Sequence, residues 1–137
     1  MTPPVVLLAA LEAFLREDLG RERGPYELYQ ARIAANLLAL LRRERELGGA
    51  LAALDREFAD AHGLDPQAMP GGLAQALRDG RVAESAAVHD FLRRRSLLAL
   101  AIDNPRYSGL LQAREAWPEL AARLDAQLAA ADSRSAE

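Results

Sequence analysis

The chain of 137 residues contains no cysteine, no lysine, one tryptophan and two histidines. Without cysteine it has no disulfide, no thiolate nucleophile and no zinc–thiolate site. Without lysine it cannot form the GxxxxGK[ST] phosphate loop, and the GxSxG turn of many hydrolases is also missing. It has neither an HExxH motif nor a Glu-x-x-His pair, so we expect no metal and no cofactor.

Charge and hydropathy argue against two further classes of protein. A net charge of -3 is unfavourable for nonspecific binding to nucleic acid. The N-terminal apolar run ends at Glu12, far short of the roughly 20 residues that span a membrane. The segment before it lacks the basic start of a signal peptide. We therefore expect a cytoplasmic protein that binds neither nucleic acid nor membranes.

The composition that is present favours helices. Hydrophobic residues make up 50% of the chain but aromatic residues only 5%, so alanine and leucine must form most of the core. Both residues are good helix formers and poor strand formers. We predict an all-α fold, a single irregular bundle of six or seven helices over residues 1–131, with a disordered tail at 132–137.

Prolines and glycines predict where these helices begin and end. Thr2 is expected to cap the first helix and Gly20 to stop it, and Gly48–Gly49 is expected to end the helix that starts at Pro25. Asp103 or Asn104 is expected to cap a helix with Pro105 in its first position. The expected helices are 3–19, 25–47, 50–62, 73–79, 84–102, 105–117 and 118–131.

One polar residue interrupts an apolar stripe of the long helix. The stripe has a helical spacing and consists of Tyr29, Ile33, Leu37 and Leu40. Asn36 falls within it, and Arg32 lies one turn before Asn36. A buried asparagine needs hydrogen-bond partners, which the segment 103–107 could provide if the two segments meet. Asn36 then either ties a helix to a loop or belongs to a ligand site.

The segment around residues 103–107 has the same two interpretations. Asp103, Asn104 and Pro105 are typical of a joint between helices. Capping does not explain the guanidinium of Arg106 or the ring of Tyr107, which are suited to binding an anion beside a helix N-terminus. We favour a structural joint and keep a ligand site as the alternative.

The run Arg93–Arg95 turns about 100° per residue around its helix, so at least one arginine lies near the apolar stripe. It could lay its stem on the core, pair with an acid or face a partner protein. We favour a solvated helix face.

Two stretches, ARIAANLLALLRRERELG and LLALAIDNPRYS, together resemble a small bacterial family, domain of unknown function 6285. The shared pattern is an R-[VI]-A-A-N helix and a later L-A-I-x-N-P-R-Y. The matching positions are Arg32, Ala34, Ala35, Asn36, Asn104, Pro105, Arg106 and Tyr107. The resemblance implies a short helical protein, often encoded beside an aminoglycoside-phosphotransferase-like kinase and an acyl-CoA dehydrogenase. It implies no catalytic residue.

Three functions follow for the chain. The first is a noncatalytic accessory protein that binds a kinase-like or dehydrogenase-like partner and exposes an apolar patch, expected on the terminal helices. The second is a binder of an anionic or acyl-CoA-like ligand, with a polar pocket around Arg32, Asn36, Arg106 and Tyr107. The third is an enzyme with Tyr107 or His89 as acid–base. We favour the first, and the sequence leaves a homo-oligomer open.

Overall fold

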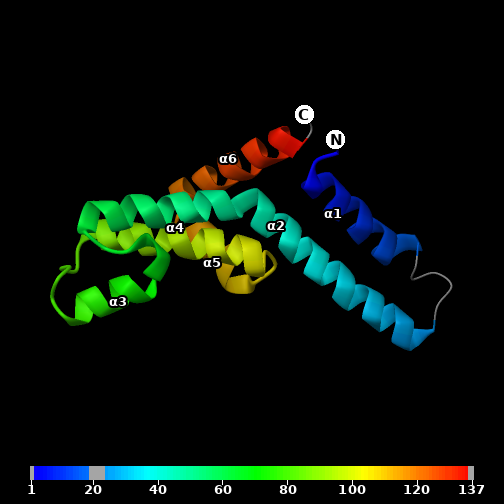
Figure 1. The fold of residues 1–137 in the computed structure, drawn as a ribbon, viewed down its shortest axis with the longest axis horizontal. Helices are drawn as coiled ribbons and strands as arrows, with labels where there is room; N and C mark the ends of the chain where they lie inside the picture. The colour runs from blue at the N-terminus through cyan, green and yellow to red at the C-terminus, as the bar shows by residue number, and fades with distance from the viewer. Residues whose placement is uncertain (1, 19–23, 136–137) are drawn as a thin grey trace. The chain divides into compact units, whose positions relative to one another are not determined.

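The computed structural model describes residues 2–18 and 24–135, and over these residues the chain is helical without any strand. The all-α fold class predicted from the composition is confirmed. The elements in chain order are α1 (Pro4–Ala13), the π-helix η1 (Phe14–Asp18), α2 (Pro25–His62), the 3₁₀ segment η2 (Pro66–Ala68), α3 (Gly71–Arg78), α4 (Ala86–Asp103), α5 (Ser108–Ala116) and α6 (Pro118–Ser135). Figure 1 labels the six α-helices.

The helices fall into two compact units. The first unit comprises Met1–Leu47 with Leu128–Glu137, and the second unit comprises Gly48–Gln127. The boundary on α2 thus falls at the two glycines, residues 48 and 49. Each unit is described by itself below.

In the first unit, α1 and η1 lie beside the first part of α2 and run antiparallel to it (Figure 1). Glu12 accepts hydrogen bonds from Nε of Arg16 at 3.2 Å and from Nε of Arg42 at 3.4 Å. One turn along η1, Nη2 of Arg16 donates to Oδ1 of Asn36 at 3.0 Å. The connection between the helices is therefore polar, and α1 buries none of its own residues.

In the second unit, the end of α2 packs antiparallel to α4 through an aromatic stack and an ion pair. The ring of Phe58 stacks on Phe91, with centroids 4.1 Å apart, and on His62 at 4.0 Å. Arg95 donates two hydrogen bonds to the carboxylate of Asp55, at 2.8 and 3.2 Å. These two contacts fix the register of the helix pair around a buried apolar core.

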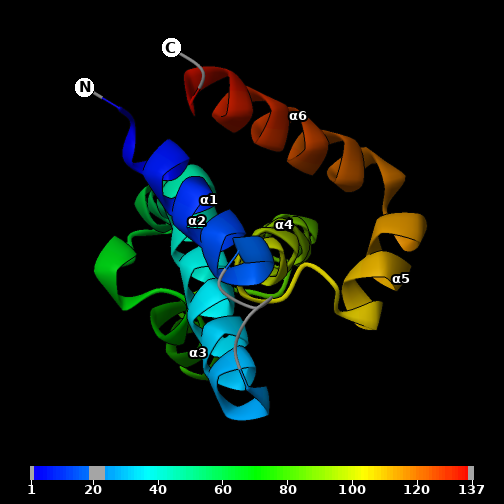
Figure 2. The ribbon, with the colours of Figure 1, turned by 90° about the vertical axis from the view of Figure 1, so that its right-hand side faces the viewer.

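The connection from α4 to α5 is a short turn, seen in Figure 2 where α4 lies nearly end-on. The backbone N–H of Asn104 closes α4 on Leu100, and that of Tyr107 then closes a turn on the carbonyl of Asn104 at 3.0 Å. The prediction that Asp103 or Asn104 caps a helix starting at Pro105 is wrong. A residue before proline is disfavoured in the helical region, so α4 ends before Asn104. The turn over residues 104–107 follows, and α5 begins at Ser108.

The predicted helix end at Gly48–Gly49 is also wrong, because α2 continues through both glycines to His62. Each glycine costs about 1 kcal/mol relative to alanine inside a helix. The following stretch, ALAALDREFADAH, is rich in helix formers and packs on α4, which outweighs that cost. The predicted stop at Gly63 is confirmed, since α2 ends at His62 and Gly63 has a φ of 65°.

The two chain ends also differ in detail from the sequence-based expectations. Thr2 does not cap α1, whose N-cap is Pro3 without a side-chain hydrogen bond. The expected stop at Gly20 lies outside the described residues. At the other end α6 extends to Ser135, so residues 132–135 continue the helix, and residues 136–137 of the expected tail lie outside the described residues.

Candidate functional site

The predicted polar cluster is divided between the two units. Arg32 and Asn36 stand on α2 in the first unit, and both side chains are exposed. Asn36 is not buried as its stripe indicated, and its amide oxygen is satisfied by Arg16. Arg32 makes no hydrogen bond or ion pair with any described residue. That the two segments meet to form one site stays a prediction.

The other half of the cluster lies in the turn between α4 and α5. Asp103 is the last residue of α4, Asn104 is its C-cap, and both are exposed together with Arg106. The ring of Tyr107 lies over Gly109, where a Cβ would come within 2.5 Å of Cε1. Because α5 does not begin at Pro105, the free helical N–H groups expected beside Arg106 are not there. The turn by itself has the features of a joint between helices.

The first part of α2 exposes five of its large apolar residues, whereas its buried residues are three alanines and Leu47. Ala31, Ala35 and Ala39 are buried at a spacing of one turn. Three residues of the stripe that we expected to be buried, Tyr29, Ile33 and Leu37, stand two positions away, about 200° around the helix, and face outward, whereas Leu40 is half-buried. We call this exposed stripe the outer face of α2; it consists of Tyr26, Tyr29, Ile33, Leu37 and Leu41.

The same unit exposes further apolar side chains on its N-terminal helices. On α1 and η1 these are Val6, Leu7, Leu11 and Phe14. A hollow of about 700 Å³ lies between α1 and α2 and is lined by Pro4, Leu7, Leu8, Leu41, Glu44 and Arg45. The first unit therefore presents apolar side chains from two adjacent helices, with charged groups at the edge of the hollow.

Electrostatic contacts hold the two helices together beside this surface. Partial burial lowers the pKa of Arg42, but hydrogen bonds and charge from Glu46 and Glu12 outweigh burial and raise that pKa above its ordinary value. Arg42 donates to both carboxylate oxygens of Glu46, at 3.1 and 3.3 Å. Arg42 thus stays charged at any physiological pH and joins α1 to α2.

The three consecutive arginines of α4 have three different environments. Arg95 is partly buried and pairs with Asp55, as the acid-pairing alternative proposed. Arg93 lies over the ring of Trp117, 5.4 Å from its centroid, which is a cation–π contact. Arg94 lines a cavity and lies 3.7 Å from Asp90. The solvated face that we favoured is therefore wrong for Arg95, whose position on the inner side of α4 the run alone did not specify.

Neither a metal-binding cluster nor a membrane-spanning helix occurs among the residues that the structure describes. No group of three or more His, Asp or Glu side chains there is placed to hold a metal ion. None of the helices in residues 2–18 and 24–135 has the length and hydropathy needed to cross a membrane.

These observations define the chain as an all-α protein with an exposed apolar helix face and a polar joint between two helices. The chain belongs to the family described as Domain of unknown function (DUF6285), whose model matches residues 22–107. The match includes the first part of α2 and the α4–α5 turn, whereas α5 and α6 follow it. No curated protein and no solved structure matches the chain.

Sequence patterns alone could not assign the outer face of α2 correctly. An apolar stripe at helical spacing favours burial, and the Tyr29–Leu37 stripe has that spacing. The competing signal was the second stripe, Ala31, Ala35 and Ala39, which is equally periodic and has smaller side chains. Two apolar stripes on opposite sides of one helix could have indicated that one of them faces outward.

Proposed function

We propose that this chain is a noncatalytic, cytoplasmic accessory protein that binds another protein through the outer face of α2. The observation that carries the proposal is the orientation of α2 in the first unit. Five of its large apolar side chains are exposed, whereas Ala31, Ala35 and Ala39 are buried. Burying these alanines stabilises the unit little, so the five larger side chains are available for burial against a partner.

The size and chemistry of the outer face suit a protein partner. From Tyr26 to Leu41 the face extends about 22 Å, since a helix rises about 1.5 Å per residue. Tyrosine and leucine side chains in a continuous row are typical of a helix that binds in an apolar groove. The hollow beside Leu41 continues the apolar surface onto α1. Contiguous exposed apolar surface of this kind is uncommon on proteins that act alone.

The partner that we propose is a phosphotransferase-like kinase or an acyl-CoA dehydrogenase. These are the two classes that the family resemblance implies are encoded next to such chains. The partner is expected to offer an apolar groove that takes Tyr29, Ile33 and Leu37.

A pull-down from native cell extract tests this proposal with a matched pair of variants. Leu37 on the outer face is 56% exposed and Leu111 on α5 is 54% exposed, so glutamate at either position is tolerated by the folded chain. Wild type and Leu111→Glu are expected to recover a kinase-like or dehydrogenase partner in stoichiometric amount. Leu37→Glu is expected to recover at least about tenfold less of this partner, because a charge in an apolar interface is costly.

Three results would contradict the proposal. The first is recovery of the partner by Leu37→Glu at the wild-type level. The second is an equal loss with Leu111→Glu, which would place the contact elsewhere. The third is recovery of copies of this chain alone, which would show self-association in place of the proposed partner.

A further inference from the structure

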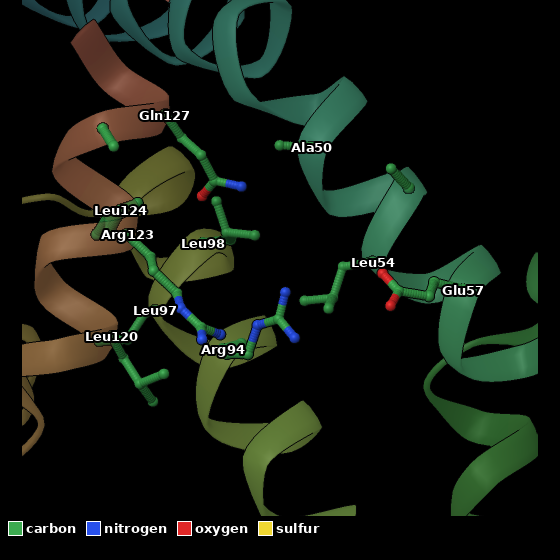
Figure 3. A pocket seen from close by; sticks show the side chains of 12 residues that line it. Ala50, Leu54, Glu57, Arg94, Leu97, Leu98, Leu120, Arg123, Leu124 and Gln127 are labelled. Carbon is green, nitrogen blue, oxygen red and sulfur yellow. The ribbon is translucent and has the colours of Figure 1, made fainter. Parts of the chain in front are cut away.

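The second unit contains a cavity that the proposed function does not use. Its volume is about 420 Å³, within the range of roughly 300–1,000 Å³ typical of small-ligand sites. Figure 3 shows side chains from α2, α4 and α6 around it. Its apolar wall is formed mainly by leucines, namely Leu54, Leu97, Leu98, Leu120 and Leu124. A ligand here would bury an apolar portion against these leucines.

Two guanidinium groups reach into the same cavity from facing helices. Figure 3 shows Arg123 extending from α6 toward α4, and Arg94 of α4 with its guanidinium directed toward Leu54 and Glu57 of α2. Arg123 makes no hydrogen bond or ion pair with any described residue, and Arg94 has only the 3.7 Å contact with Asp90. Glu57 of α2 adds one carboxylate to the lining. Two cations directed at one space repel each other unless an anion lies between them.

We propose that this cavity binds an amphipathic anion, a medium-chain carboxylate whose acid group is held by Arg94 and Arg123 and whose hydrocarbon chain lies on the leucine wall. Arginine binds carboxylates through paired N–H donors, so two arginines can hold both oxygens of one acid group. The leucines supply no polar group, so the part of the ligand that lies on them must be apolar. The site is independent of the outer face of α2, which lies in the other unit.

Three probes that differ in one feature each test the chemistry of the ligand. Octanoate has both the acid group and the chain, acetate lacks the chain, and octanol lacks the charge. By titration calorimetry on the full chain, octanoate is expected to bind saturably with one molecule per chain. Acetate and octanol are each expected to bind at least about tenfold more weakly, because each lacks one of the two contacts.

Matched variants test the location. Arg123→Gln is expected to weaken octanoate binding about tenfold or more, whereas Arg56→Gln, at an exposed position of α2 outside the lining, leaves it unchanged. Ala53→Phe is expected to block the cavity, and the control Ala52→Phe, on the next residue and outside the lining, is not. Glu57→Gln is expected to tighten binding severalfold, because it removes a carboxylate that competes for the arginines.

Several outcomes would overturn this inference. They are an absence of saturable octanoate binding, octanol binding as tight as that of octanoate, and octanoate binding that Arg123→Gln leaves unchanged. Weaker binding by Glu57→Gln would contradict the placement of the anion at the arginines. Circular dichroism checks the fold of each variant. If Ala53→Phe does not fold, the exposed Arg123 and Arg56 pair still decides the location.

Discussion

Fifteen of the twenty buried apolar residues in the described chain belong to the second unit, including Phe58, Phe91 and Leu97. The first unit buries five, and four of them are alanines. Exposure shows the opposite distribution, since nine of the twelve exposed large apolar residues lie in the first unit. The second unit therefore uses its large side chains for its own core. The first unit is joined by ion pairs and keeps its large side chains at the surface, where a partner can cover them.

A phenylalanine from each unit gives the largest expected difference. Phe91 is 2% exposed and stacked on Phe58, whereas Phe14 is 48% exposed. Phe91→Ala is expected to lower the free energy of unfolding by about 3–5 kcal/mol, as for other buried phenylalanines. Phe14→Ala is expected to change it by less than about 0.5 kcal/mol, as for surface positions. Urea denaturation measures both free energies of unfolding. Equal losses of stability for the two variants would contradict the difference between the units.

Breaking the Asp55–Arg95 ion pair in the second unit is expected to give the next largest loss of stability. Asp55 is 9% exposed and is held by two hydrogen bonds from Arg95. Asp55→Ala leaves the Arg95 guanidinium without its partner and is expected to cost about 1–3 kcal/mol. The control is Asp125→Ala, which breaks the exposed pair with Arg114 and is expected to cost no more than about 1 kcal/mol. The same denaturation curves compare them, and a cost no greater for Asp55→Ala than for Asp125→Ala would refute a structural role for this pair.

Substitution of a glycine at the boundary between the units gives a smaller effect of opposite sign. Gly49 is exposed within α2, and a Cβ built there meets no atom within 4 Å. Gly49→Ala is therefore expected to stabilise the chain by about 0.5–1 kcal/mol, because alanine is the better helix former. Thermal unfolding measures it. A loss of stability would show that the helix does not continue through the boundary, as the sequence had suggested.

The sequence allowed the fold class to be predicted but not every helix boundary. Alanine and leucine content, with glycine stops such as Gly63, led to the all-α fold. The Gly48–Gly49 stop was wrong because local preference at two residues is small beside the packing of the helix that follows. The helix expected at Pro105 was wrong because residues 104–107 form a turn, closed by the Tyr107 N–H on the carbonyl of Asn104, and α5 begins only after it.

The candidate sites were less predictable than the fold. Arg32 and Asn36 were proposed as site residues from the pattern, yet periodicity does not specify which of two apolar stripes faces inward. Arg94 and Arg123 are 29 positions apart and share a cavity only because α4 and α6 both line it. No local spacing relates two such residues, so only the tertiary structure could bring them together.

The affinity of this chain for the isolated partner is the most direct test of the claim that the exposed apolar residues of the first unit form a binding surface. Once the kinase-like or dehydrogenase partner is purified, calorimetry compares wild type with Leu37→Glu and Leu111→Glu. We expect Leu37→Glu to weaken binding at least about tenfold and Leu111→Glu to leave it unchanged. Equal affinity of all three chains would show that the outer face of α2 is not the binding surface.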